Sequence, residues 1–133
     1  SPKDLYNFPQ NKFVANFIGD ANVVKAEILN KQSNSYDLKI AEMKIKVQSD
    51  KELGETVSVA LRPEKISINK DKKENSIHAT VNNASFVGNS YQYILNSNAG
   101  KLFVISGETN DTFKVGEEVF LSINDKEVKI LND

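Results

Sequence analysis

The sequence predicts an all-β fold, a small barrel or sandwich with a short helical segment at its N-terminal end. Three observations support this prediction. About ten short runs alternate apolar and polar residues, which is the period of a half-buried strand. Turn residues separate these runs at short intervals, as in all-β domains. In addition, one stretch of sixteen residues occurs twice, which indicates a β-module duplicated within the 133 residues of the chain.

The repeated stretch is the feature around which the rest of the chain is organised. Residues 53–68 and 115–130 align without a gap. Each copy opens near a Gly-Glu pair, where glycine suits a turn with positive φ, and continues with apolar residues at alternate positions. A corner then breaks each run. It is Arg62-Pro63-Glu64 in the first copy, where proline cannot donate to a sheet ladder, and an Asn-Asp turn pair in the second. Each copy is therefore predicted to form a strand, a corner and a second strand.

The first 22 residues have the signals of short helices. Ser1 suits an N-cap and is followed by proline at the first helical position. Phe13 and Phe17 have the i,i+4 spacing of an apolar pair on a helix, and Gly19 suits a C-cap. This segment is too short to fold alone. We expect it to be a connection from a preceding domain, packed on the β-region by its two phenylalanines.

The strands follow from the same alternation in two related halves, about residues 23–69 and 76–131. In the first half we expect a polar turn over 31–35 and a hairpin turn at Ala41-Glu42. In the second half we expect a five-residue turn over 96–100 and a polar loop over 106–114. Between the halves, the mixed-charge run 69–75 is predicted to be an exposed linker. The predicted strands cover residues 23–29, 36–40, 43–47, 57–61, 66–68, 77–87, 91–95, 102–105, 119–123 and 128–130.

The composition excludes several classes of protein. No run approaches the roughly 18 apolar residues of a membrane span. The absence of cysteine excludes disulfides and thiolate metal sites. A net charge of −1 argues against broad binding to a phosphate backbone, because such binding requires a basic face. The single methionine is Met43, so the sequence has no initiator, and we expect it to be part of a larger protein.

Arg62 is distinctive because the other basic residues are all lysine. Lysine cannot replace arginine at a bidentate site, so the arginine in the corner indicates that its fork geometry matters there. The alternative is chance together with a solvated strand end. Our hypothesis for Arg62 is structural: its guanidinium pairs with Glu64 or caps carbonyl groups at the corner.

No catalytic or metal site is predicted. The sequence has no Gly-rich phosphate loop and no nucleophile elbow. His78 has no Cys, Asp or Glu partner at ligand spacing, so we interpret it as a packed or solvated residue. Glu117 and Glu118 flank a turn, where they favour solubility rather than acid–base chemistry.

Three separated motifs resemble the C-terminal region of ATP-binding subunits of bacterial ABC importers, the group serving spermidine/putrescine, maltose, iron and sulfate systems. In that family a nucleotide-binding domain runs into a transport-associated OB (TOBE) domain, an OB-like β-barrel. The resemblance implies that residues 1–22 connect an upstream ATPase domain to a TOBE domain over 23–133. The motifs are Ser1-Pro2-Lys3-Asp4-Leu5-Tyr6 with Phe13-Val14-Ala15-Asn16-Phe17-Ile18-Gly19-Asp20-Ala21-Asn22, then Leu61-Arg62-Pro63-Glu64, then Phe86-Val87-Gly88.

The resemblance implies a regulatory and dimer-stabilising role without catalysis. ATP and Mg²⁺ would bind only in the upstream domain, and this part would need no cofactor. The implied partners are a second copy of the ATPase subunit, permease subunits reached through the upstream domain, and a small-molecule regulator. The implied location is the cytoplasmic face of the bacterial inner membrane. The polyamine branch, spermidine/putrescine import, is the first expectation; iron, sulfate, sugar or glycerol-phosphate import are alternatives.

The resemblance also assigns residues. The family signature falls on Arg62, Pro63 and Glu64, and the domain entrance falls on Phe17, Gly19 and Asn22. Turn glycines are expected at Gly54, Gly88 and Gly116.

Two other functions remain open at this stage. An OB-fold nucleic-acid binder would use stacking aromatic rings along a basic groove, but the acid–base balance supplies no basic stripe, so we expect no nucleic-acid partner. A small-ligand site is the other. A cationic polyamine would need several carboxylates to converge, for which the candidates are Asp20, Glu27, Glu108 and Asp111.

Overall fold

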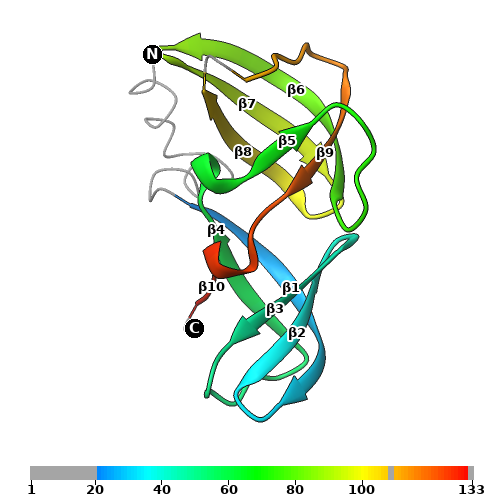
Figure 1. Cartoon of the computed structure of the whole chain (residues 1–133), viewed down its shortest axis with the longest axis vertical. Coiled ribbons are helices and arrows are strands. Elements are labelled where there is room, and N and C mark those ends of the chain that lie inside the picture. Colours follow the sequence, from blue (N-terminus) through cyan, green and yellow to red (C-terminus); the bar gives the residue numbers. More distant parts are fainter. Residues whose placement is uncertain (1–20, 108–109, 132–133) are drawn as a thin grey trace.

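The computed structural model describes residues 21–107 and 110–131. Within them the all-β prediction is confirmed (Figure 1). The predicted helical connection, with Phe17 and Gly19, lies outside the described residues up to residue 20. No helix in the described part could span a membrane. The described elements are β1 (Asn22–Gln32), β2 (Ser35–Ile40), β3 (Met43–Gln48), β4 (Thr56–Leu61), the 3₁₀ helix η1 (Pro63–Lys65), β5 (Ser67–Asn69), β6 (Ile77–Val87), β7 (Ser90–Ser97), β8 (Gly100–Gly107), β9 (Glu118–Ser122), the 3₁₀ helix η2 (Asp125–Glu127) and β10 (Val128–Ile130).

The strands form two five-stranded sheets, drawn in the lower and upper parts of Figure 1. The first sheet has the order β10-β4-β1-β2-β3, and the second has the order β5-β9-β6-β7-β8. Strand β5 follows β4 in the chain but joins the second sheet. Strand β10 follows β9 but joins the first. One edge strand of each sheet, β10 or β5, therefore follows directly after a strand of the other sheet. The two sheets cannot separate without breaking the pairing of β10 with β4 and of β5 with β9.

The two exchanged strands pair in the same register. Lys129 of β10 lies opposite Ala60 of β4, and Ser67 of β5 lies opposite Ser122 of β9. These two pairs are equivalent in the repeat. Residue 67 of the first copy aligns with residue 129 of the second, and residue 60 aligns with residue 122. The corners η1 and η2 are equivalent in the same way. The predicted order of strand, corner and strand is therefore confirmed in both copies.

The long strands of the two sheets also have matching irregularities. In β1 the register shifts between Ile28 and Asn30, and in β6 it shifts between Val81 and Asn83. Each shift is a β-bulge, which bends and twists the strand. At the bulge in β6, the Val81 N–H donates to the carbonyl of Glu117 at 3.0 Å. The corresponding bond in β1 runs from the Ile28 N–H to the carbonyl of Glu55 at 2.9 Å. The bends curl both sheets around their apolar faces.

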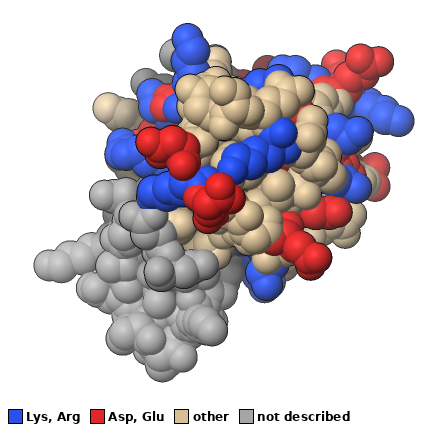
Figure 2. Space-filling view, turned by 90° about the horizontal axis from the view of Figure 1, so that it is seen from below, with Lys and Arg blue, Asp and Glu red and all other residues tan. Residues whose placement is uncertain are grey.

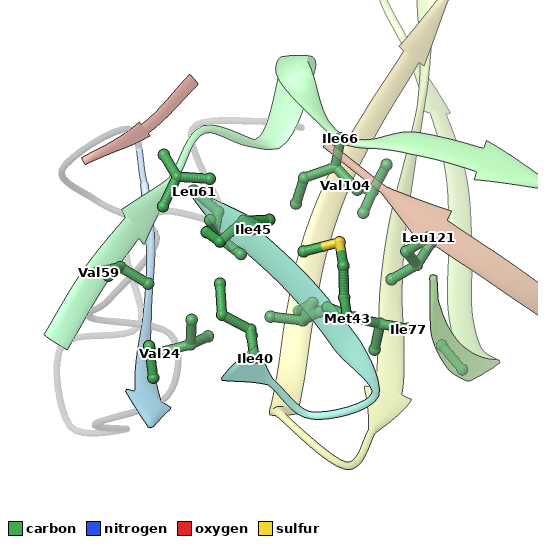
Figure 3. Packing of buried hydrophobic residues seen from close by; sticks show 14 of the residues in the cluster. Val24, Ile40, Met43, Ile45, Val59, Leu61, Ile66, Ile77, Val104 and Leu121 are labelled. Atoms are coloured by element: carbon green, nitrogen blue, oxygen red, sulfur yellow. The ribbon is translucent and has the colours of Figure 1, made fainter. Parts of the chain in front are cut away.

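One apolar core joins the two sheets. Met43 from β3, Ile77 from β6 and Leu121 from β9 lie together between them (Figure 3), and all three are almost fully buried. The alternation in β4 supplies Val59 and Leu61 to the same core. Removing a buried leucine or isoleucine side chain from such a core costs about 2–5 kcal/mol, so neither sheet is expected to be stable without the other.

Buried tyrosines anchor the loops that lead into the repeated stretch. Tyr36 donates its hydroxyl to the carbonyl of Lys51 at 2.6 Å and accepts from the Leu53 N–H at 3.3 Å. In the second sheet, Tyr93 accepts from the Phe113 N–H at 3.1 Å. Each hydroxyl thus satisfies main-chain groups of a loop that has no strand partner, as buried polar groups require.

Three local predictions were wrong. The turn expected over 96–100 is shorter, because Ser97 pairs with Gly100 in the β7–β8 ladder. The polar turn expected over 31–35 is shorter too, since β1 continues to Gln32 and β2 begins at Ser35. Gly116 has the expected positive φ, 92°, whereas Gly54 is not among the glycines with positive φ.

Candidate functional site

Asn22, the predicted entrance residue that lies within the described part of the chain, is buried and fixed by three hydrogen bonds. Its side chain is 1% exposed. The amide nitrogen donates to the carbonyl of Phe103 at 2.9 Å and to that of Leu61 at 3.1 Å. The amide oxygen accepts from the Phe103 N–H at 2.7 Å. Asn22 therefore holds the edge of β8 in the second sheet against β4 in the first.

Asn75 makes a related contact with the edge of the first sheet. Its amide nitrogen donates to the carbonyl of Lys44 at 2.8 Å, and its oxygen accepts from the Lys44 N–H at 2.7 Å. Lys44 lies on β3, the edge strand of the first sheet. Sequence reasoning placed Asn75 in an exposed linker and missed this role. A signal was present, because Asn22 and Asn75 each stand two residues before the first buried apolar residue of a long strand, Val24 or Ile77.

The signature corner is built on Pro63 rather than on the arginine. Pro63 is buried at the first position of η1, where its fixed φ suits a helix start. The Lys65 N–H closes the turn by donating to the carbonyl of Arg62 at 3.0 Å. The Arg62 side chain is exposed. Within the part of the chain that the structure describes, no ion pair or hydrogen bond joins its guanidinium to Glu64 or to a carbonyl. The pairing that we expected is therefore not formed.

An ion pair joins the two corners. The Lys65 ammonium of η1 lies 3.8 Å from the Glu127 carboxylate of η2. Lys65 and Glu127 occupy the same position in the two copies of the repeat, so the ion pair joins equivalent points of the two halves. Both side chains are partly exposed, at 48% and 36%, and such a pair contributes little stability. It does place the two corners side by side.

Two grooves flank the corners and differ in charge. The groove beside η1, of about 340 Å³, is lined by the carboxyl residues Glu64 and Asp111, and none of its described lining residues is basic. The groove beside η2, of about 460 Å³, contains Lys46 and Lys126 with a single acid, Asp125. The remaining polar lining of the first groove is Ser67, Ser106 and Asn110.

The carboxylates considered for a cation site are only partly brought together. Asp111 shares the η1 groove with Glu64, while Glu27 does not line it. Asp20 and Glu108 lie outside the described residues. Within residues 21–107 and 110–131, no group of three or more His, Cys, Asp or Glu side chains is arranged to hold a metal ion.

A third hollow contains the single histidine. The His78 ring stacks on Phe120 with centroids 5.0 Å apart, and its Nε2 lies 3.6 Å from the Glu118 carboxylate. Glu42, Glu74 and two lysines complete a lining of mixed charge. Among the described residues, Glu118 is the one carboxylate within ion-pair distance of the half-exposed ring, and this environment fits the packed or solvated role expected for His78.

Of the remaining glycines of the predicted set, Gly88 and Gly116 are turn residues, whereas Gly54 is not. Gly88 has φ 61° and follows β6 at the turn into β7. Gly116 donates its N–H to the carbonyl of Val81 at 2.8 Å, which fixes the entry to β9. Gly54 precedes β4 in an open position, with no atom within 4 Å of an added Cβ.

The charges on the face seen in Figure 2 are interspersed. Lysine and acidic side chains alternate over this surface, with uncharged residues between them. A single-stranded nucleic-acid groove combines a basic track with aromatic rings, and this face has no such track. The expectation that nucleic acid is not a partner stays a prediction.

The chain has relatives among known proteins. A family model described as TOBE domain matches residues 59–131, more than half of the chain. The chain is 24% identical over 132 residues to the Fe(3+) ions import ATP-binding protein FbpC of Brucella suis. It is 30% identical over 131 residues to the spermidine/putrescine import ATP-binding protein PotA of Clostridioides difficile. These alignments cover 99% and 98% of the chain but 37% and 36% of the relatives. The chain therefore spans little more than a third of their length, in their C-terminal part.

A solved structure has the same fold. The cytoplasmic molybdate-binding protein ModG, with molybdate bound, superimposes with a TM-score of 0.65 at 14% identity. The superposition covers 82% of this chain and 94% of that chain. At this identity the likeness shows the fold alone, and the OB-like fold class predicted from the sequence is confirmed.

Proposed function

The chain belongs to the TOBE domain family, and we propose that it is the C-terminal regulatory and dimer-stabilising domain of the ATP-binding subunit of a bacterial ABC importer. The observation that carries this proposal is the alignment of almost the whole chain with the C-terminal part of ATP-binding import proteins. The domain would catalyse no reaction itself, since ATP and Mg²⁺ would bind in a domain upstream of it.

The interlocked sheets support a bracing role. Because β5 and β10 are exchanged between the sheets, the domain can transmit a force without its sheets moving apart. The shared core and the clamps made by Asn22 and Asn75 favour the same rigid behaviour. We propose that this rigid body arose by duplication of one β-module, with halves of about residues 23–69 and 76–131.

The proposed partners follow from the family of the relatives. A second ATP-binding subunit would pair with this one, and permease subunits would contact the upstream domain. The complex would lie at the cytoplasmic face of the bacterial inner membrane.

Polyamines, spermidine and putrescine, are the solutes that we propose first. The support is the 30% identity to the spermidine/putrescine protein of Clostridioides difficile. Relatives named for Fe(3+) import are 24–26% identical, so ferric iron is the alternative. The η1 groove, with Glu64 and Asp111, offers a place where a cationic regulator could bind.

A melting experiment tests for a regulator. A solute that binds only the folded state raises the melting temperature with its concentration. Spermidine, putrescine, ferric citrate and molybdate are to be titrated separately against the chain. A rise with spermidine that Glu64→Gln abolishes would support a cation site in the η1 groove, while no rise with any of the four would exclude a regulator of these classes.

The function itself is tested in the organism that carries the gene. We expect the reading frame to encode a Walker A loop upstream of this chain, and ATP-dependent uptake of labelled spermidine to require the gene. Uptake of labelled iron, with spermidine uptake unaffected by deletion of the gene, would transfer the assignment to iron import. A reading frame that encodes no nucleotide-binding motif would contradict the proposal.

A further inference from the structure

We propose that residues 83–87 of strand β6 form an edge through which two copies of this chain pair in antiparallel fashion. This inference rests on the dimer-stabilising function proposed above, and it identifies the surface that performs it. Three features of the hairpin formed by β6 and β7 carry the inference: an open main-chain edge, an absence of charge, and an exposed aromatic ring.

The outer edge of β6 is paired over only part of its length. Strand β9 lies opposite Ile77 to Thr80. The loop before β9 then occupies Val81, which exchanges main-chain hydrogen bonds with Gly116 and Glu117. From residue 83 to 87, β6 pairs only with β7. Alternate residues of an antiparallel strand direct their N–H and C=O groups away from the partner, and no described strand or loop receives those groups in this segment.

This open edge lacks the usual protection. Proteins protect exposed edges with charged side chains, especially lysine, and with proline. From residue 79 to 100 the chain has no Asp, Glu, Lys, Arg or Pro, although 26% of all its residues are charged. The corresponding part of β1, beyond its own bulge, carries Lys31, which pairs with Glu52 at 2.9 Å. One of the two related hairpins is therefore protected and the other is not.

An aromatic ring is exposed on the same segment. Phe86 is 51% exposed and packs against Tyr91 with centroids 4.7 Å apart. Tyr91 stacks on Tyr93 at 6.2 Å, and Tyr93 meets Phe113 edge to face at 5.8 Å. This column of rings runs from the surface into the core and holds Phe86 in place. Few charges and rigid aromatic side chains are typical of the centre of a protein interface.

A second copy of the chain is the partner that these features fit. In a two-fold contact, the same surface of both copies meets itself, so a charged residue near the axis would face its own like charge. The uncharged segment avoids that repulsion. Antiparallel pairing of two identical segments satisfies the open N–H and C=O groups of both copies at once and covers both Phe86 rings.

Disulfide trapping tests the pairing directly, because the natural chain contains no cysteine. Single-cysteine variants are to be made at each position from 83 to 87 in the whole chain and oxidised under mild conditions. Opposed residues on paired antiparallel strands come close enough for a disulfide. We expect a cross-linked dimer that is most abundant at one or two neighbouring positions. The matched control is Gln32→Cys, since Gln32 stands as far beyond the bulge of β1 as Ser85 stands beyond that of β6, and it is expected to remain uncross-linked.

Sedimentation equilibrium provides the second measurement. Ser85→Lys places like charges opposite each other at the edge, and we expect the dimer dissociation constant to rise at least tenfold with the melting temperature unchanged. Gln32→Lys is expected to leave both unchanged. A dimer that resists Ser85→Lys, or that cross-links equally through Gln32→Cys, would show that another surface pairs; the inference would then fail while the proposed dimer function stands. A chain that is monomeric at all concentrations and forms no cross-link would overturn the inference and the bracing function together.

Discussion

The side-chain amide of Asn22 forms two hydrogen bonds with the main chain of Phe103, at 2.7 Å and 2.9 Å. A third bond, to the carbonyl of Leu61 at 3.1 Å, gives every hydrogen-bonding group of the amide a partner except one lone pair. Asn22 begins the first sheet and Phe103 lies on the edge of the second. This one side chain thus binds the main chain of β8, and it couples the two sheets from within.

Replacing Asn22 is expected to destabilise the whole domain. Asn22→Ala removes three buried hydrogen bonds to the main chain of Phe103 and Leu61, and each such bond contributes about 0.5–1.5 kcal/mol. We expect a total loss of about 3 kcal/mol on the same basis, measured by urea unfolding. The matched control is Asn75→Ala, whose bonds to Lys44 are exposed, so water can replace them and the loss should be smaller. An equal loss in the two variants would contradict the clamp.

The corner makes a second prediction, in which proline matters more than arginine. The Arg62 side chain is exposed and has no ion-pair partner among the described residues, so Arg62→Lys should change the free energy of unfolding by less than about 0.5 kcal/mol. Pro63→Ala should lower it by about 1 kcal/mol, because the unfolded chain gains freedom and a buried ring is lost. Thermal unfolding of both variants checks this order. A larger loss for Arg62→Lys would restore the role first assigned to the guanidinium.

The glycines that open the two repeat copies should respond differently to alanine. Gly116 has φ 92°, where a side chain costs of order 1–3 kcal/mol, so Gly116→Ala should destabilise by about that amount. Gly54 lacks a positive φ and has open space around an added Cβ. Gly54→Ala should therefore be neutral or stabilise by up to about 1 kcal/mol. Melting temperatures that fall equally in both variants would contradict the difference between the two turns.

The burial of Tyr93 leads us to expect that the free energy of unfolding falls at high pH. Burial raises the pKa of its phenol above the usual value of 10.0, since the charged form would lose its hydration. Below pH 10 the protonated phenol is favoured in both states, and its contribution is fully present. As the pH rises from 10 through the higher folded pKa, the unfolded state releases its proton first, so stability falls. Urea unfolding between about pH 8 and pH 11, on both sides of the usual pKa of tyrosine, measures this decline.

A conservative variant separates this effect from other groups that titrate at high pH. Tyr93→Phe removes the titrating hydroxyl but leaves the Phe113 N–H without its partner. We expect a loss of about 1–2 kcal/mol at pH 7 together with a shallower decline above pH 10. An equally steep decline in Tyr93→Phe would assign the pH dependence to other residues.

The sequence predicts the strands of this fold better than it predicts their partners. Apolar alternation located β6 at both ends, because Ile77 and Val87 border polar turns. It did not reveal that β5 and β10 change sheets, since the period of a strand says which side chains face the core and not which neighbour it pairs with. The pairing of Ser67 with Ser122 is known from the structure and could not be predicted from the sequence.

The candidate site could be predicted in the same partial way. Family resemblance singled out Asn22 and the Arg62-Pro63-Glu64 corner, but neither the clamp on Phe103 nor the exposed guanidinium could be read from it. Asn75 was missed because a polar residue in a charged run has the same sequence signal whether it is solvated or holds a sheet edge. Long-range contacts of polar side chains depend on topology, which local patterns do not encode.

The proposed bracing function is tested most directly by the dimerisation of the complete product of the gene that encodes this chain, which we propose to be an ATP-binding subunit. Sedimentation equilibrium is to be run on that subunit with and without residues 23–133, in the absence of nucleotide. We predict that the removal raises the dimer dissociation constant at least tenfold while the remaining protein still binds ATP. A dissociation constant that is unchanged by the removal would contradict the account.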